Sequence, residues 1–178
     1  MTYCWRRLDF VGLEILQLTR DEHALGAHAS IIDAGAGQFS LRIEWTLDPT
    51  WRARTLKLTQ QTRLGVKTLQ IERGRRGWVV DDKPRPDLND CLEVDVSATP
   101  FCNGLALHAL AHEPGELTAL YVDATDLSVR PARQRYERVS ERKWRYIDLG
   151  VARGFEAVLD FDEDGLVTRY EGLFERCA

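Results

Sequence analysis

The sequence predicts a mainly β domain of the α+β type, built on one mostly antiparallel sheet with one or two short helices. The clearest observation is an unbroken alternation of polar and apolar side chains over residues 38–48. Successive side chains of a strand point to opposite faces, so Phe39 and Trp45 are expected on a dry face and Arg42 on a wet one. Similar period-two segments recur along most of the chain, and segments long enough to form covering helices are few.

Six period-two segments separated by turn signals predict an antiparallel meander in the first 80 residues. They are residues 13–19, 25–33, 38–48, 51–60, 66–73 and 78–80. Residues 83–89 contain two prolines and are expected to form a loop.

The middle of the chain predicts a helix and then further strands. Thr99 is expected to cap the helix with Pro100 at its first position, and the helix is expected to end between Gly104 and Ala111. Residues 117–123 are apolar on both faces, which favours a central strand. The remaining predicted strands cover residues 134–139 and 143–149, as a hairpin, and residues 155–161 and 166–170.

Length and composition favour one soluble domain over residues 1–178. The formal net charge of -4 argues against nucleic acid as a partner, because phosphate binding needs a basic surface. Every apolar stretch is interrupted by charges, and Asp9 and Glu14 break the only candidate signal core, so we expect no integral membrane association and a cytoplasmic location. The four cysteines form no C-x-x-C pair and are expected to be reduced thiols.

Residues Asp160 to Glu171 match the spacing of an EF-hand calcium loop. An EF-hand needs a helix on each flank, whereas the leading flank here alternates with the period of a strand. We therefore expect a hairpin turn with Gly165 at a positive φ, and whether this loop binds calcium stays open.

His108 and His112 are four residues apart, a spacing that places two imidazoles on one helix face. The position after His108 is Ala109, where a zinc peptidase needs a glutamate. Two ordinary surface histidines are the simpler interpretation, and no metal or cofactor is predicted. No catalytic motif is present in the sequence.

A one-sided sheet must bury its apolar face by curling, by adding a helix or by holding an apolar guest. Trp45 and Trp78 lie in alternating segments, where they either line a pocket or fill the core. Burial of the apolar face by an apolar guest makes a binding protein the leading hypothesis, with an apolar or amphipathic ligand.

Several short motifs resemble those of the Putative glycolipid-binding family of bacteria. The matching residues are Trp45, Asp95, Thr99, Pro100, Phe101, Asn103, Gln134, Tyr136, Asp162, Gly165, Leu166 and Val167. The resemblance implies a single curved sheet forming a half-barrel with short helices in its mouth, and a lipid-like ligand in a hydrophobic cavity. The predicted ligand-binding residues are Trp45, Trp78, Phe101, Asn103, Gln134, Tyr136 and Phe161.

Two other hypotheses stay open. One is an enzyme, a hydrolase or isomerase, that uses acids of the cavity together with His108. The other is an interaction module whose apolar face is closed by a second subunit. The leading hypothesis expects a monomer or a weak homodimer.

Overall fold

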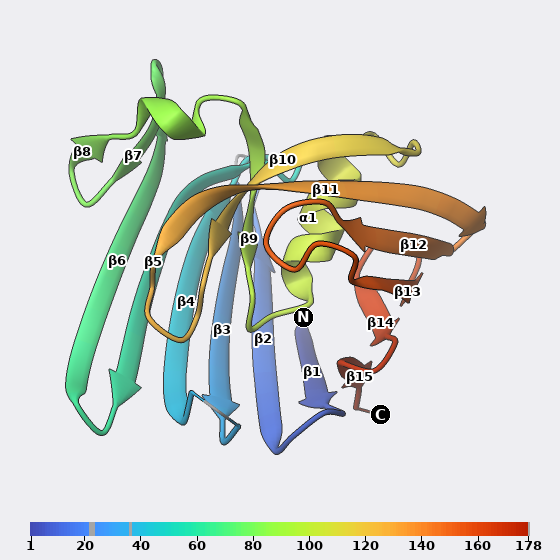
Figure 1. The fold of residues 1–178 in the computed structure, drawn as a ribbon, viewed down its shortest axis with the longest axis horizontal. Helices are drawn as coiled ribbons and strands as arrows, with labels where there is room; N and C mark the ends of the chain where they lie inside the picture. The colour runs from blue at the N-terminus through green and yellow to red at the C-terminus, as the bar shows by residue number, and fades with distance from the viewer. Residues whose placement is uncertain (22–23, 36, 178) are drawn as a thin grey trace.

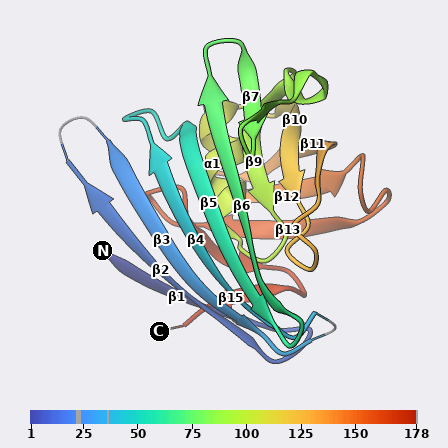
Figure 2. The ribbon, with the colours of Figure 1, turned by 90° about the vertical axis from the view of Figure 1, so that its left-hand side faces the viewer.

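The computed structural model describes residues 1–21, 24–35 and 37–177 and arranges them as one curved sheet around a single α-helix (Figure 1). Fifteen strands of these residues follow the order β8-β7-β6-β5-β4-β3-β2-β1-β15-β14-β13-β12-β11-β10-β9. The first and last strands of the chain therefore pair with each other inside the sheet. Each half of the chain forms one limb, and the two limbs face each other with the helix between them (Figures 1 and 2).

The N-terminal limb is a meander of eight strands followed by one 3-10 turn. Its elements are β1 (Thr2–Arg7), β2 (Gly12–Arg20), β3 (Leu25–Asp33), β4 (Phe39–Leu47), β5 (Ala53–Thr62), β6 (Gly65–Gly74), β7 (Gly77–Val80), β8 (Lys83–Pro84) and η1 (Pro86–Leu88). The six strands predicted for this half are confirmed, because the alternation of side chains matches the burial of every second residue.

The C-terminal limb contains the helix and seven strands. Its elements are β9 (Cys91–Val96), α1 (Phe101–Ala109), β10 (Gly115–Val122), β11 (Val129–Ser140), β12 (Lys143–Asp148), β13 (Glu156–Phe161), β14 (Val167–Tyr170) and β15 (Phe174–Arg176). The strand predicted as central, now β10, has β9 on one side and β11 on the other.

The sequence did not predict β1, β8, β9 and β15, and the expected loop over residues 83–89 contains the two-residue strand β8 and the turn η1. Strand β9 makes the sheet differ from a purely antiparallel one. Strand β9 pairs in parallel with β10, with Asp95 opposite Tyr121. The reason is the connection, because α1 carries the chain back across the sheet between the two strands, as parallel neighbours require. Strand β9 also lacks simple alternation, since both Glu93 and Val94 are buried.

The helix fills the space enclosed by the curved sheet. Its residues from Phe101 to Leu107 are all buried. The Trp45 ring meets the Phe101 ring edge-on, with centroids 5.2 Å apart. At Gly104 an added Cβ would lie 2.6 Å from the carbonyl oxygen of Gly165, so this position needs glycine for the close approach of helix and turn.

Thr99 stabilises the start of the helix, which the structure places at Phe101 with Pro100 as the capping residue, one residue later than the sequence predicts. Its hydroxyl oxygen accepts a hydrogen bond from the Phe101 N–H (3.1 Å), and its hydroxyl donates to the Glu14 carboxyl of β2 (2.7 Å). The helix ends at Ala109, and both Ala111 and His112 have positive φ. This end lies inside the interval that the sequence left open.

The half-barrel is not closed by strand pairing, and side chains bridge its two edges instead. Glu93 of β9 is fully buried, and its carboxylate accepts the Ala53 N–H of β5 at 3.2 Å. The same carboxylate lies 3.3 Å from Arg52 and 3.8 Å from Arg73. An ion-paired carboxylate therefore joins the free edge of the C-terminal limb to the meander. No helix in the described ranges has the length and apolar character to cross a membrane.

Candidate functional site

Three adjoining hollows lie along the mouth of the half-barrel, where loops of the two limbs meet. The polar hollow, of about 400 Å³, is lined by Gly37, Gln38, Gln60, Thr62, Arg63, Leu64, Gly65, Val66, Lys67 and Thr125. The middle hollow, of about 300 Å³, is lined by Arg7, Phe10, Asp33, Gly37, Phe39, Ser97, Ala98, Tyr121, Asp123, Ala124 and Thr125. The shared residues Gly37 and Thr125 make these two hollows neighbours.

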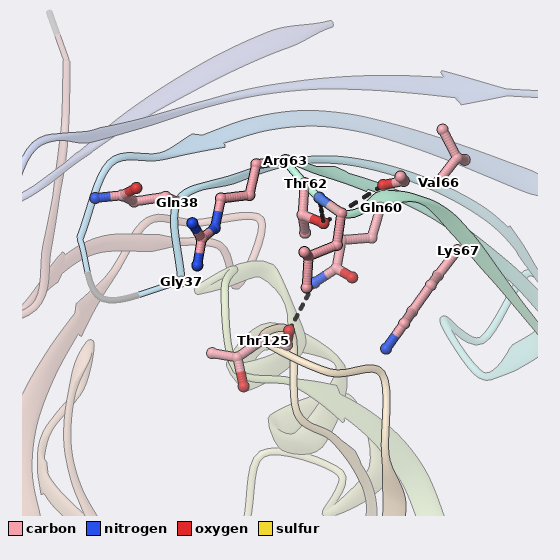
Figure 3. A pocket seen from close by; sticks show the side chains of 10 residues that line it. Gly37, Gln38, Gln60, Thr62, Arg63, Val66, Lys67 and Thr125 are labelled. Carbon is pink, nitrogen blue, oxygen red and sulfur yellow. Dashed lines mark hydrogen bonds between the residues drawn. The ribbon is translucent and has the colours of Figure 1, made fainter.

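The polar hollow lies at the β5–β6 hairpin (Figure 3). Gln60 crosses it, and its Nε2 donates hydrogen bonds to the carbonyl oxygens of Ala124 (2.6 Å) and Thr125 (3.0 Å). Arg63 and Lys67 lie on either side of Gln60 (Figure 3). This hollow is therefore basic and strongly hydrogen-bonding.

The aromatic hollow, of about 210 Å³, adjoins the middle hollow through the shared residues Ser97 and Tyr121. It is lined by Asp95, Val96, Ser97, Thr99, Asn103, Tyr121, Tyr146, Asp148, Ala152, Phe155, Tyr170, Leu173 and Phe174. These residues come from β9, α1, β10, β12, β14, β15 and the loops beside them. Apolar walls with a few convergent polar groups are typical of small-molecule sites, so this hollow is the candidate site.

Strand register explains why polar groups converge in the aromatic hollow. Gln134 and Tyr136 are two residues apart on β11, so they share one face, as do Tyr146 and Asp148 on β12. Gln134 lies directly opposite Asp148, and Tyr136 lies opposite Tyr146. The four side chains therefore form a continuous patch on the inner face.

A chain of hydrogen bonds connects the helix to the first carboxylate of the hollow. Asn103 donates from Nδ2 to the Tyr136 hydroxyl (3.0 Å), which donates to Gln134 Oε1 at 3.4 Å. Gln134 Nε2 then donates to Asp95 Oδ2 at 2.5 Å. Because Asn103, Gln134 and Tyr136 are buried, this chain fixes the orientation of the Asp95 carboxylate.

The electrostatics of the hollow are dominated by two acids. Burial raises the pKa of Asp95 to about 6, the Gln134 hydrogen bond opposes this rise, and the negative charge of Asp148 adds to it. Asp148 is 7 % exposed, and its Oδ1 accepts the Gly150 N–H at 2.7 Å. A carboxyl with a raised pKa beside a second acid is a typical property of functional sites.

Aromatic rings form the wall behind these acids. The Tyr146 ring has its centroid 6.1 Å from that of Tyr170 and 6.2 Å from that of Phe155. Tyr170 in turn lies 6.2 Å from Phe174. Burial, followed by the charge of Asp95, raises the pKa of both Tyr146 and Tyr170, so these hydroxyls stay protonated. The hollow can therefore stack against a ring and accept hydrogen bonds at its acidic end.

The structure brings together three of the predicted ligand-binding residues, namely Asn103, Gln134 and Tyr136, in the series of hydrogen bonds that ends at Asp95. Asn103 lines the aromatic hollow, and the other two support Asp95 from behind.

The other four predicted residues lie in the hydrophobic core, with at most 5 % exposure: Trp45, Trp78, Phe101 and Phe161. Trp78 donates from its indole nitrogen to the Cys91 carbonyl (3.0 Å), while Phe161 borders a separate small hollow beside His112. None of the four lines the aromatic hollow. A direct role of these residues in ligand binding stays a prediction.

His108 lies away from the acids of the aromatic hollow. Its ring stacks on Trp51 with centroids 4.7 Å apart and an interplanar angle of 5°. Burial and the neighbouring His112 lower the pKa of His108 to about 4. His108 does not line the aromatic hollow, so the hollow does not combine its acids with this histidine. In the described ranges no three potential ligand side chains cluster as a metal site would need.

The calcium-like loop is flanked by strands β13 and β14, as its alternation predicts. Asp162 Oδ1 accepts the Leu166 N–H at 2.8 Å, and its Oδ2 pairs with Arg176 at 2.6 Å. Gly165 has φ +78°. The Asp162 carboxylate is thus used to hold the turn and the last strand.

Sequence reasoning did not identify the acids and most rings of the aromatic hollow as site residues. Asp95 belongs to the matched motifs, but its inward direction follows from strand β9, which the sequence did not predict. The position of Asp148 could have been inferred from the predicted hairpin, because pairing Gln134 with it places both on the dry face. Phe155 and Phe174 carry no such local signal.

Comparison with known proteins agrees with the fold and the matched motifs. The model of the family described as Putative glycolipid-binding matches residues 2–176. A crystal structure of a DUF1089 family protein from Pseudomonas aeruginosa, at 1.80 Å resolution, is similar with a TM-score of 0.76 and 28 % identity, over 93 % of this chain and 92 % of that one. No curated protein matches the chain.

Proposed function

The chain belongs to the Putative glycolipid-binding family, and on that premise we propose that it binds an amphipathic, glycolipid-like molecule without transforming it. The observation that carries the proposal is the aromatic hollow, where rings and two carboxylates meet at the mouth of the half-barrel. Aromatic faces stack on the apolar faces of rings, and carboxylates accept hydrogen bonds from their substituents.

The ligand is expected to lie across the mouth, because α1 and the core side chains occupy the interior of the half-barrel. We place the polar head in the aromatic hollow and the apolar part in the middle hollow. The middle hollow offers Phe10, Phe39 and Ala98 to that part. Each methylene removed from water would contribute about 0.8 kcal/mol before the costs of association.

The proposal is tested by calorimetric titration of the purified protein with n-octyl β-D-glucoside below its micelle concentration. Phe155 is only partly buried and lines the aromatic hollow, so Phe155→Ala should weaken binding while the fold is retained. Val11→Ala is the matched control, since Val11 is 78 % exposed and lines none of the three hollows. Saturable binding that only Phe155→Ala weakens supports the proposal, and no binding or equal effects of both variants would refute it.

A further inference from the structure

The aromatic hollow has a charge composition that distinguishes it from its surroundings. Its lining includes Asp95 and Asp148 but no lysine, arginine or histidine. By contrast, the inward carboxylate of Glu93 has cationic partners in Arg52 and Arg73. Neither Asp95 nor Asp148 forms an ion pair with any described residue.

Each of these two acids has one oxygen engaged and one oxygen without a described partner. Asp95 uses Oδ2 to accept from Gln134, which leaves Oδ1, and Asp148 uses Oδ1 to accept from Gly150, which leaves Oδ2. Both free oxygens remain accessible to solvent, because neither is among the buried side-chain atoms without a hydrogen-bond partner. A ligand that enters the hollow can therefore donate hydrogen bonds to both, and hydrogen bonds from a positively charged donor are the stronger kind.

The rings of the hollow favour the same kind of ligand. Tyr121, Tyr146, Phe155, Tyr170 and Phe174 surround it, and the faces of aromatic rings attract cations. The protein already uses this contact nearby, where the Arg7 guanidinium lies 4.6 Å from the centre of the Phe174 ring and the Arg130 guanidinium lies 5.4 Å from that of Tyr121.

We propose that the aromatic hollow recognises a primary ammonium group on the polar head of an amphipathic ligand, an inference that rests on the proposed function. Its N–H groups would donate to Asp95 Oδ1 and Asp148 Oδ2, and the surrounding rings would contact its charge. A neutral hydroxyl would pair with the same oxygens but would leave two negative charges uncompensated. An anionic head would be repelled by both acids.

The test compares three amphiphiles that share an eight-carbon chain, each below its micelle concentration: octylammonium chloride, n-octyl β-D-glucoside and sodium octanoate. The unaltered protein should bind octylammonium at least about tenfold more tightly than the glucoside, the size of one charged hydrogen bond, and octanoate most weakly. Competition by glucosamine and by ethanolamine then distinguishes an amino sugar from a simple aminoalcohol as the natural head.

Two neutral variants, Asp95→Asn and Asp148→Asn, each remove one charge with little change of shape. Each should weaken octylammonium binding by about tenfold or more and glucoside binding by less, because the asparagine oxygen can still accept a hydrogen bond from a hydroxyl but no longer carries the charge. Asp87→Asn is the control, because Asp87 is an exposed acid paired with Arg85 and lines none of the hollows. Thermal unfolding verifies that each variant is folded.

The outcomes separate this inference from the function on which it rests. Equal or tighter binding of the glucoside, or unchanged octylammonium binding in both variants, would overturn the ammonium inference and leave amphiphile binding intact. Failure of all three amphiphiles to bind would overturn both. Loss of octylammonium binding in the two variants but not in Asp87→Asn would support both.

Discussion

Glu14 should make the stability of this protein depend on pH in a way that one substitution removes. Its side chain is buried in β2, where Oε1 accepts the Thr99 hydroxyl and Oε2 has no hydrogen-bond partner. Burial raises the pKa of Glu14 from its ordinary value of 4.5 to about 8, against the lowering effect of the Thr99 hydrogen bond.

The sign follows from the protons bound in each state. Between pH 4.5 and about 8 the unfolded chain has released the Glu14 proton while the folded chain retains it. The free energy of unfolding therefore falls as pH rises through this window and levels off above it. At 1.36 kcal/mol for each pH unit, the difference between the folded and unfolded pKa values of Glu14 corresponds to a fall of about 5 kcal/mol in the free energy of unfolding, a large part of the stability of an ordinary domain.

The perturbation is Glu14→Gln, whose carbonyl oxygen can still accept the Thr99 hydroxyl. Urea unfolding at pH 5 and pH 8.5, at constant ionic strength, gives the fall in the free energy of unfolding for the variant and for the unaltered protein. Asp95 contributes to the fall in both proteins, so the difference between them isolates Glu14. Glu44→Gln, at an exposed glutamate of β4, is the control for the loss of one acid. An equal fall in Glu14→Gln and the unaltered protein would refute the reasoning.

Three further predictions concern the site, the edge of the sheet and the two termini. Octylammonium affinity should be constant above about pH 7 and should fall by up to about tenfold per pH unit well below 6, because protonation of Asp95 removes its charge while the facing tyrosines, with raised pKa values, stay neutral. Calorimetry from pH 5 to 8 measures the affinity, and a flat profile would contradict the prediction. Glu93→Gln should lower the free energy of unfolding by roughly 2 to 4 kcal/mol, because it leaves Arg52 and Arg73 without their partner across the open edge. Urea unfolding measures this change, and a change below about 0.5 kcal/mol would show that the ion pairs of Glu93 are unimportant for stability. Diamide should link Cys4 to Cys177 by a disulfide, because the Cys177 N–H donates to the Cys4 carbonyl (2.8 Å) and opposite residues of a hydrogen-bonded antiparallel pair are about 5.5 Å apart at Cα. Peptide mass spectrometry would detect the disulfide, and only unlinked thiols after oxidation would count against the prediction.

Local pattern predicted most of the sheet because each strand of the meander carries its own signal. Phe39 to Leu47 alternates without interruption, and the structure buries every apolar residue of that strand. Strand β9 escaped prediction although Leu92, Val94 and Val96 alternate with two acids, and its burial does not follow that alternation, since Leu92 is exposed and Glu93 is buried. Strand β15 escaped prediction because it is only three residues long. Parallel pairing of β9 with β10 depends on the route of the helix, which local pattern does not specify.

The candidate site was only partly predictable for a related reason. Asn103, Gln134 and Tyr136 have polar groups at positions that face inward, and the matched motifs include all three. The rings of Trp45 and Trp78 are equally compatible with a pocket and a core, and only packing against α1 and β9 places them in the core. Phe155, Tyr170 and Phe174 meet at the aromatic hollow through loops and strand order, so their proximity is a property of the assembled sheet.

The central claim is that the ligand occupies the aromatic hollow, and amide chemical-shift mapping during titration with n-octyl β-D-glucoside tests it most directly. The account predicts that the largest saturable shifts fall on Asp95, Tyr146, Asp148, Phe155 and Tyr170. Shifts confined to the β5–β6 hairpin around Arg63 and Lys67, or spread evenly over the exposed surface, would contradict it.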